Sequence, residues 1–120
     1  MPSQKQEKGF KAENLARGYL ELSGYEILAQ NWRHGHLEVD LVARIANELV
    51  VVEVKSRKAW FIENETDLLP FNKQRALAEA AEAYLVENHL DLDMRFDLMV
   101  VLGDENHQIK HLTHAFFPEF

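Results

Sequence analysis

The stretch Leu37–Arg57 decides the fold and reads LEVDLVARIANELVVVEVKSR. It contains two runs in which apolar and polar residues alternate, separated by a short polar break at Ala46-Asn47. This pattern predicts an antiparallel β-hairpin. In the first run the predicted faces carry Leu37, Val39, Leu41 and Ala43 on one side, and Glu38, Asp40, Val42 and Arg44 on the other.

A two-residue turn at that break fixes which side chains meet across the hairpin. Pairing that starts at the residues flanking the break puts Asp40 opposite Glu53 and Glu38 opposite Lys55, all on one face. Directly opposed Cβ atoms lie about 5 Å apart, and like charges placed that way are destabilising. We therefore expect a positive group between Asp40 and Glu53, and a hard divalent cation with oxygen ligands is the simplest one.

The composition predicts one domain over residues 1–120, because 47% of the chain is hydrophobic and can fill a core. The absence of cysteine excludes disulfides and thiolate zinc sites. The polar N-terminus lacks an apolar signal core, and no apolar run approaches the ~18 residues of a membrane span. We expect no membrane partner and a cytoplasmic location.

The net charge of −7 argues at first against a nucleic-acid partner, but the acid is unevenly distributed. Residues 1–60 carry nine basic and eight acidic residues, whereas residues 61–120 carry four and twelve. A bound metal ion would further neutralise the acid around the hairpin. The total charge therefore does not exclude nucleic acid near the hairpin.

The remaining pattern predicts an α/β fold with the order α-β-β-β-α-β-β. A mixed β-sheet flanked by helices follows, with the strands before and after the second helix parallel. The predicted elements are a helix over 4–23, a strand over 25–30, the central hairpin, a loop over 59–71, a helix over 73–89 with Asn72 as N-cap, an interior strand over 95–102 and an edge strand over 108–116.

The hairpin also carries groups suited to phosphodiester hydrolysis. Asp40 and Glu53 can hold Mg²⁺, which binds phosphate oxygens and lowers the pKa of a bound water. Lys55 shares a face with Glu53 and can either orient or activate the attacking water, or neutralise charge on the phosphate. We place Asp97 outside this group and expect it to pair with Arg95 or a helix end.

The same stretch is similar to the PD-(D/E)xK nuclease core of the restriction-endonuclease-like fold. Nearly the whole chain resembles the bacterial YraN family, which is related to archaeal Holliday-junction resolvases. The matching residues are Glu13-Asn14-Leu15-Ala16, Gly24-Tyr25, Asn31, Arg33, Glu38-Val39-Asp40-Leu41, Val52-Glu53-Val54-Lys55-Ser56-Arg57, Lys73 and Arg95-Phe96-Asp97.

The resemblance implies a role for each matched site residue. Asp40 and Glu53 bind the metal, Mg²⁺ or Mn²⁺, and Lys55 is the catalytic lysine. Glu13 adds a carboxylate carried by a helix. Glu38 matches the acidic residue before the motif aspartate and either coordinates metal or pairs with Lys55.

The substrate and the assembly are expectations of the same kind. The resemblance implies a DNA partner, including branched or structured DNA, and makes a homodimer plausible. Arg33, Arg57 and Lys73 are candidates for phosphate contacts, although single basic residues are usually only solvated.

Two alternatives stay open at this stage. The first is a nucleic-acid-binding module that keeps the nuclease fold and does not cut. The second is a zinc hydrolase in which His34, His36, Glu38 and Asp40 line one face of a strand as an H-x-H-x-E-x-D ribbon.

Overall fold

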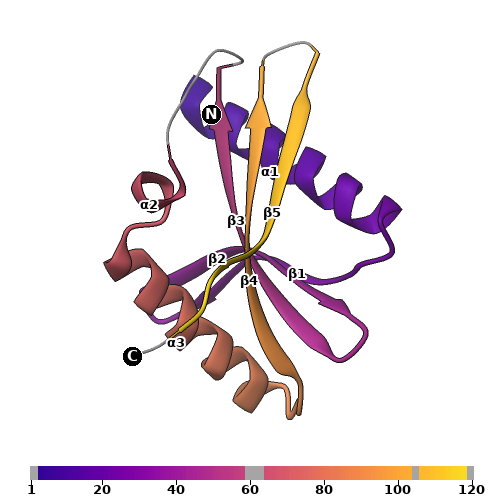
Figure 1. The fold of residues 1–120 in the computed structure, drawn as a ribbon, viewed down its shortest axis with the longest axis vertical. Helices are drawn as coiled ribbons and strands as arrows, with labels where there is room; N and C mark the ends of the chain where they lie inside the picture. Colours follow the sequence, from indigo (N-terminus) through magenta and orange to yellow (C-terminus); the bar gives the residue numbers. More distant parts are fainter. Residues whose placement is uncertain (1–2, 59–63, 104–105, 119–120) are drawn as a thin grey trace.

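The computed structural model describes residues 3–58, 64–103 and 106–118. The chain forms a twisted sheet with a long helix on each side (Figure 1). The elements are α1 (Gln4–Leu22), β1 (Glu26–His34), β2 (Leu37–Ile45), β3 (Glu48–Arg57), α2 (Glu65–Leu68), α3 (Phe71–Glu87), β4 (Asp93–Leu102) and β5 (Gln108–Phe116).

The sheet follows the chain, with the strand order β1-β2-β3-β4-β5. The β2–β3 hairpin pairs Ile45 with Glu48 and turns at Ala46, whose φ is +50°. The predicted two-residue turn is therefore confirmed. β3 and β4 pair in parallel through the α3 crossover, and β5 lies at the edge, as the pattern predicted. This topology is compatible with a restriction-endonuclease-like fold.

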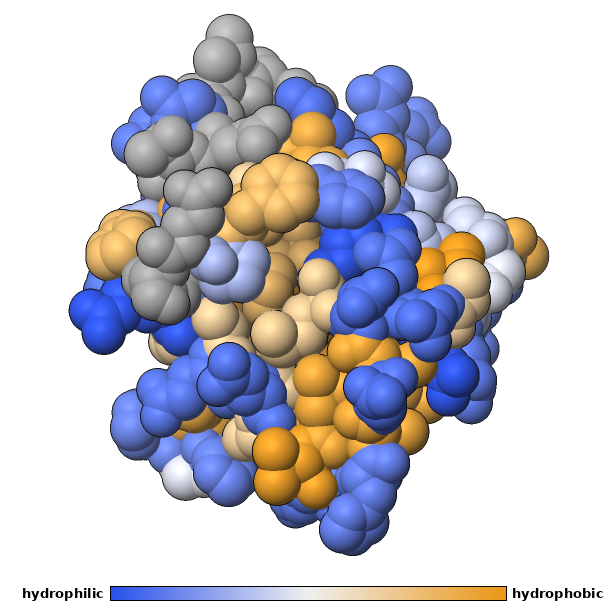
Figure 2. All heavy atoms as spheres, turned by 60° about the horizontal axis from the view of Figure 1, so that its bottom comes forward, coloured by the Kyte–Doolittle hydropathy of each residue, from blue (hydrophilic) through white to orange (hydrophobic). Residues whose placement is uncertain are grey.

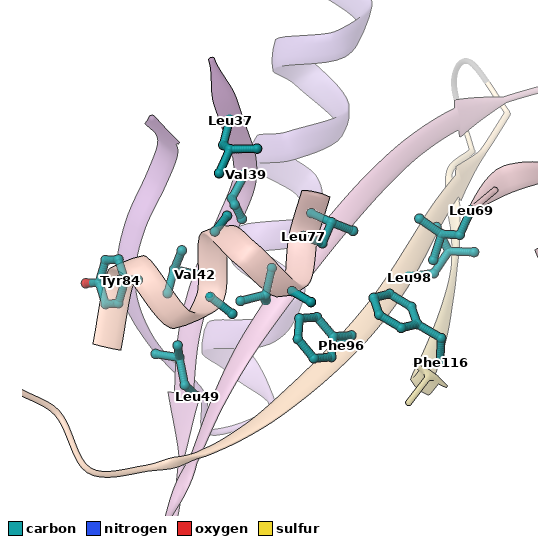
Figure 3. Packing of buried hydrophobic residues seen from close by; sticks show 14 of the residues in the cluster. Leu37, Val39, Val42, Leu49, Leu69, Leu77, Tyr84, Phe96, Leu98 and Phe116 are labelled. Atoms are coloured by element: carbon teal, nitrogen blue, oxygen red, sulfur yellow. The ribbon is translucent and has the colours of Figure 1, made fainter. Parts of the chain in front are cut away.

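The two long helices cover opposite faces of the sheet and bury separate clusters. Ala16 and Leu20 of α1 pack with Val50, Val52 and Met99 on one face. On the other face, residues of α3 pack against β2, β3 and β4, and Figure 3 shows the labelled side chains of this cluster pointing toward one another. Within the described residues, no helix is both long enough and apolar enough to cross a membrane.

One prediction about β2 is wrong, because its side chains change face near Asp40. Leu37 and Val39 pack in the α3 cluster, whereas Leu41 and Ala43 pack in the α1 cluster. The register places Asp40 between the β1–β2 pairs Trp32–Val39 and Gln30–Leu41, opposite Asn31. Asn31 has a φ of +53°, a left-handed conformation that breaks the alternation of a regular strand.

Three predicted boundaries also differ from the structure. β1 continues past Gln30 to His34, because the left-handed residue bends the strand without ending its pairing to β2. The segment predicted as a loop contains the short helix α2. Pro70, rather than Asn72, is the N-cap of α3, and its carbonyl accepts hydrogen bonds from the amides of Lys73 and Gln74.

A buried polar network lies where β4 meets β5. Asp97 accepts two hydrogen bonds from Arg95, at 2.9 and 2.7 Å, and one from His111 Nε2 at 2.7 Å. The backbone amide of His114 donates to the same carboxylate at 3.2 Å, where the β4–β5 register shifts. Asp97 therefore fills a break in the ladder, and its expected pairing with Arg95 is confirmed.

Candidate active site

The candidate site lies where β2 and β3 separate. Their ladder ends at the pair Leu41–Val52, and from there the carboxylate of Asp40 takes the place of a backbone acceptor. Its Oδ2 atom accepts a hydrogen bond from the amide of Val54 at 2.8 Å. The register was therefore predicted correctly as far as Leu41, but the cross-strand pairing of Glu38 with Lys55 is not formed.

Glu53 is the second buried acid of the site and is only 4% exposed. Its Oε2 atom lies 3.1 Å from Nζ of Lys73 and 3.9 Å from Nζ of Lys55. Neither contact has hydrogen-bond geometry, so Oε2 is a buried oxygen without a hydrogen-bond partner among the described residues. Two ammonium groups thus face one carboxylate oxygen, which stays available to a further ligand.

The proximity of the two acids changes the ionisation of Asp40. Burial raises its pKa, and a hydrogen bond with Glu53 and the negative charge of Glu53 raise it further, to about 8. The hydrogen bond from Val54 opposes this shift and does not cancel it. Without a metal, Asp40 therefore holds a proton over much of the neutral pH range.

Glu13 reaches the site from α1. Burial raises its pKa, and the charges of Glu38 and Glu53 add to the shift, against hydrogen bonds from Asn31 and Gln30. Its Oε2 atom is buried without a hydrogen-bond partner among the described residues. The electrostatic influence of Glu13 on Asp40 shows that both acids belong to one charged region.

These residues fit a Mg²⁺ ion that keeps several waters. No three carboxylates or imidazoles within the described ranges are already close enough to form a complete metal site. Mg²⁺ needs only one or two carboxylates, because waters and phosphate oxygens supply its other ligands. Asp40 and Glu53 meet that requirement, and the unpartnered oxygens of Glu53 and Glu13 are the kind of donor the ion prefers.

The other predicted site residues lie around this centre. Glu38 is exposed and pairs with Arg33 across the β1–β2 hairpin at 3.6 Å. Arg57, at the end of β3, donates to the carbonyl of Ser56 at 2.9 Å. Lys73, a predicted phosphate contact, lies against Glu53, the buried predicted metal ligand.

The zinc ribbon is not formed, because a turn at Gly35 separates the histidines from β2. His34 ends β1, stacks on Trp32 and lies 3.6 Å from a carboxylate oxygen of Glu87. His36 belongs to the turn itself. The four residues therefore do not share one face of one strand.

Sequence reasoning missed two contributors to the site. Asn31 supplies the bend opposite Asp40 and a hydrogen bond to Glu13. A cavity of about 660 Å³ also opens beside the site, between the start of β2 and the first turns of α3, with Lys73 and Arg75 in its lining. An asparagine within an apolar strand was a usable signal for the bend, whereas the cavity depends on how α3 docks.

Comparison with known proteins identifies the family of this chain. The sequence model of the group described as "Uncharacterised protein family UPF0102" matches residues 12–101, which include Glu13, Asp40, Glu53 and Lys55. The chain belongs to the UPF0102 family. The matched region includes the residues of the candidate site described above, whereas Phe116 of the α3-side cluster lies beyond it.

Relatives in this family match almost end to end. A UPF0102 protein of Bacteroides thetaiotaomicron is 41% identical over 113 residues, which cover 93% of each chain. The UPF0102 protein of Phocaeicola vulgatus is 38% identical with the same coverage. A third, from Porphyromonas gingivalis, is 35% identical over 90% of this chain and 80% of the relative.

Proposed function

We propose that this UPF0102 protein is a Mg²⁺-dependent endonuclease-like protein that binds DNA and hydrolyses its phosphodiester bonds. The observation that carries the proposal is the meeting of Asp40 and Glu53 where β2 and β3 separate, with Lys55 beside them. Two neighbouring acids, the half-buried Asp40 and the buried Glu53, destabilise the fold when no counter-charge lies between them. They become favourable when a divalent cation binds between them.

Each residue of the site has a distinct part in the proposed reaction. Asp40 and Glu53 would hold the ion, which supplies a water of lowered pKa and polarises a phosphate oxygen. Asp40 must lose its proton to take part. Lys55 faces the same space as Glu53 and either positions the attacking water or stabilises the negative charge that develops on the phosphate.

The cations around Glu53 support a phosphate-facing role for this side of the sheet. Lys73 lies within 3.1 Å of Glu53 and also lines the 660 Å³ cavity. A divalent ion at Glu53 would leave the ammonium of Lys73 able to contact a phosphate oxygen. Arg75 in the same cavity adds a second positive charge.

Membership of a nuclease superfamily is part of the same proposal. The acid-x-lysine arrangement on β3 agrees with the PD-(D/E)xK nucleases, and the matched residues with the YraN name for this family. We extend the proposal to branched or structured DNA and to a cytoplasmic location, where chromosomal DNA is the substrate at hand.

A homodimer is a further part of the proposal. Figure 2 shows apolar side chains gathered in a band bordered by hydrophilic residues. Large exposed hydrophobic residues of the described chain are Tyr19, Leu22, Phe71, Val86 and Phe117. All of these except Phe117 lie on two separate helices, so the contiguous band of Figure 2 is the surface that favours self-association. Light scattering during gel filtration should give twice the chain mass of 13.9 kDa, and a monomer at micromolar concentration would contradict the dimer.

Calorimetric titration with Mg²⁺ or Mn²⁺ tests the metal. We expect the wild type to bind and Asp40→Ala to lose most of that binding, whereas Asp93→Ala, at an exposed acid of β4, should bind like the wild type. If the wild type binds neither ion, the proposal loses its basis.

Cleavage of duplex, single-stranded, flapped and four-way DNAs tests the reaction. We expect Lys55→Ala to cut at least 100-fold more slowly than the wild type, and Lys110→Ala, an exposed lysine on β5, to cut normally. Equal residual cutting by the wild type and Lys55→Ala would indicate contamination. DNA binding without any cutting would favour the binding module instead.

A further inference from the structure

A second cavity lies on the α1 side of the sheet, beside the ends of β3 and β4 (upper part of Figure 1). Its volume is about 300 Å³, and Lys8, Lys11, Ser56, Gly103 and His107 are among the residues that line it. Lys8 and Lys11 are three positions apart on α1, so their side chains lie on one face of the helix. The cavity is thus lined by two ammonium groups from α1 and by polar residues of the strand ends.

His107 contributes an unpaired nitrogen to this region. Its Nδ1 atom lies 2.9 Å from the carbonyl oxygen of Gly103, and a carbonyl only accepts, so Nδ1 carries the hydrogen. Nε2 is buried and has no hydrogen-bond partner within the described parts of the chain. Gly103 has a φ of +90°, a conformation open to glycine, and its amide closes onto the carbonyl of Arg57 at 3.0 Å. The ring is therefore fixed at one nitrogen and unsatisfied at the other.

The chemistry of these groups selects an anion. Lysine ammonium groups only donate hydrogen bonds, and the hydroxyl of Ser56 can donate as well. No carboxylate occurs among the described residues that line the cavity. A phosphate group offers several oxygens, which can accept from all of these donors at once.

The cavity shares lining residues with a hollow that reaches the part of β3 that carries Lys55. A neighbouring hollow of about 470 Å³ shares Lys8 and Ser56 with it and extends to Lys55 and Arg57. Lys55 in turn lies 3.9 Å from Glu53. Positive groups therefore follow the end of β3 from the predicted metal ligand to α1, within a protein whose net charge is −7.

We propose that the Lys8–Lys11–His107 cavity binds a backbone phosphate of a nucleic-acid strand, one whose neighbouring phosphodiester lies at Glu53 and Lys55. The choice of a strand rests on the proposed function, whereas the affinity for phosphate rests on the cavity alone. α1 thereby becomes part of the nucleic-acid interface, in addition to the cavity beside α3.

The test measures binding of a fluorescent single-stranded oligonucleotide in EDTA, at several NaCl concentrations, so that neither metal nor cleavage contributes. The double variant Lys8→Gln/Lys11→Gln should bind roughly tenfold more weakly, with a log–log salt slope reduced by about 1. Lys110→Gln is the matched control, because its cross-strand partner Val100 packs in the α3 cluster, on the other face of the sheet. Equal binding by the double variant and the control would overturn the inference.

A second measurement separates this site from the proposed function. Inorganic phosphate is titrated while the imidazole signals of His107 are followed by NMR. We expect His107 to shift in the wild type and in Asp40→Ala, and to shift much less in the double variant. If no oligonucleotide binds, the proposed function fails, and these shifts alone decide the phosphate site. If His107 does not respond to phosphate, the site is refuted whatever the metal does.

Discussion

Two aspartates, the half-buried Asp40 and the buried Asp97, each lie where a strand ladder is interrupted, but their electrostatic surroundings are opposite. Asp40 and Asp97 each accept a backbone amide where a strand ladder is interrupted. Asp97 also accepts hydrogen bonds from the side chains of Arg95 and His111. Burial alone would raise its pKa, but these hydrogen bonds and charges hold it below the usual range. Asp40 instead faces Glu53, and its pKa rises to about 8.

This difference distinguishes an aspartate that stabilises the fold from one placed in a candidate active site. The acceptors of Asp97 are all occupied, and the neighbouring guanidinium is anchored by the hydroxyl of Tyr25 at 2.6 Å. Asp40 instead lies beside a second acid, Glu53, which has an oxygen without a hydrogen-bond partner among the described residues. A buried carboxylate surrounded by donors stabilises the fold, whereas one placed beside another acid costs stability and is typical of a functional site.

The largest expected effect concerns the satisfied aspartate. Asp97→Asn removes the nearer counter-charge of the buried Arg95 guanidinium and leaves only Glu48, at 3.4 Å, so unfolding in urea should show a loss of about 3 kcal/mol at pH 7. Asp93→Asn, an exposed acid on the same strand, should cost less than about 0.5 kcal/mol. Similar losses in the two variants would break the comparison, because Asp97 would then act as an ordinary surface acid.

Asp40→Asn should instead stabilise the protein at high pH. The folded-state pKa of Asp40 lies above its unfolded value of 3.8, so the stability that its carboxyl contributes is full below that value and is lost as pH rises through about 8. In EDTA at pH 9, the amide should therefore stabilise the protein by about 2 kcal/mol, while still accepting from Val54. Urea unfolding at pH 5 and pH 9 measures this. A variant less stable than the wild type at pH 9 would refute the description of Asp40.

The affinity for a metal ion should depend on whether the carboxyl of Asp40 is protonated. Because the ion displaces the proton of Asp40, the apparent association constant for Mn²⁺ should rise roughly tenfold from pH 6 to pH 7 and level off above pH 8. Calorimetry in buffers of different ionisation enthalpy counts the protons released. A flat profile with no proton release would show that Asp40 is already ionised.

The smallest effect concerns Lys73. Its ammonium lies 3.1 Å from Glu53 and competes with the ion for the same oxygen. Because the lysine side chain is 37% exposed, solvent screens this pair, and Lys73→Met should tighten Mn²⁺ binding only about threefold. Lys110→Met should leave the affinity unchanged. Weaker binding by Lys73→Met would mean that Lys73 supports the ion rather than competes with it.

Local pattern was sufficient to predict much of this fold. The alternation around the Ala46-Asn47 break correctly predicted the turn and the register as far as Leu41–Val52. The apolar run in β4 identified an interior strand next to β3, and Asp97 pairs with Arg95 as expected. These features depend on neighbours in sequence or on strict periodicity.

The errors arose where contacts between distant segments override that periodicity. A left-handed Asn31 bends β1 opposite Asp40, so the faces of β2 exchange and the predicted pairing of Glu38 with Lys55 is lost. Lys73 could not be assigned to Glu53, because its position depends on how α3 packs across the sheet. The bonding of Asp97 to His111 likewise needed the register shift in β5.

The hydrogen bond from the Val54 amide to Asp40 has a practical consequence. The amide resonance of Val54 becomes a built-in reporter, because its chemical shift depends on whether the carboxylate it touches carries a proton, a charge or a cation. One crosspeak in a heteronuclear spectrum can therefore follow protonation and ion occupancy in the intact protein. Neither a dye nor a substrate is needed for that readout.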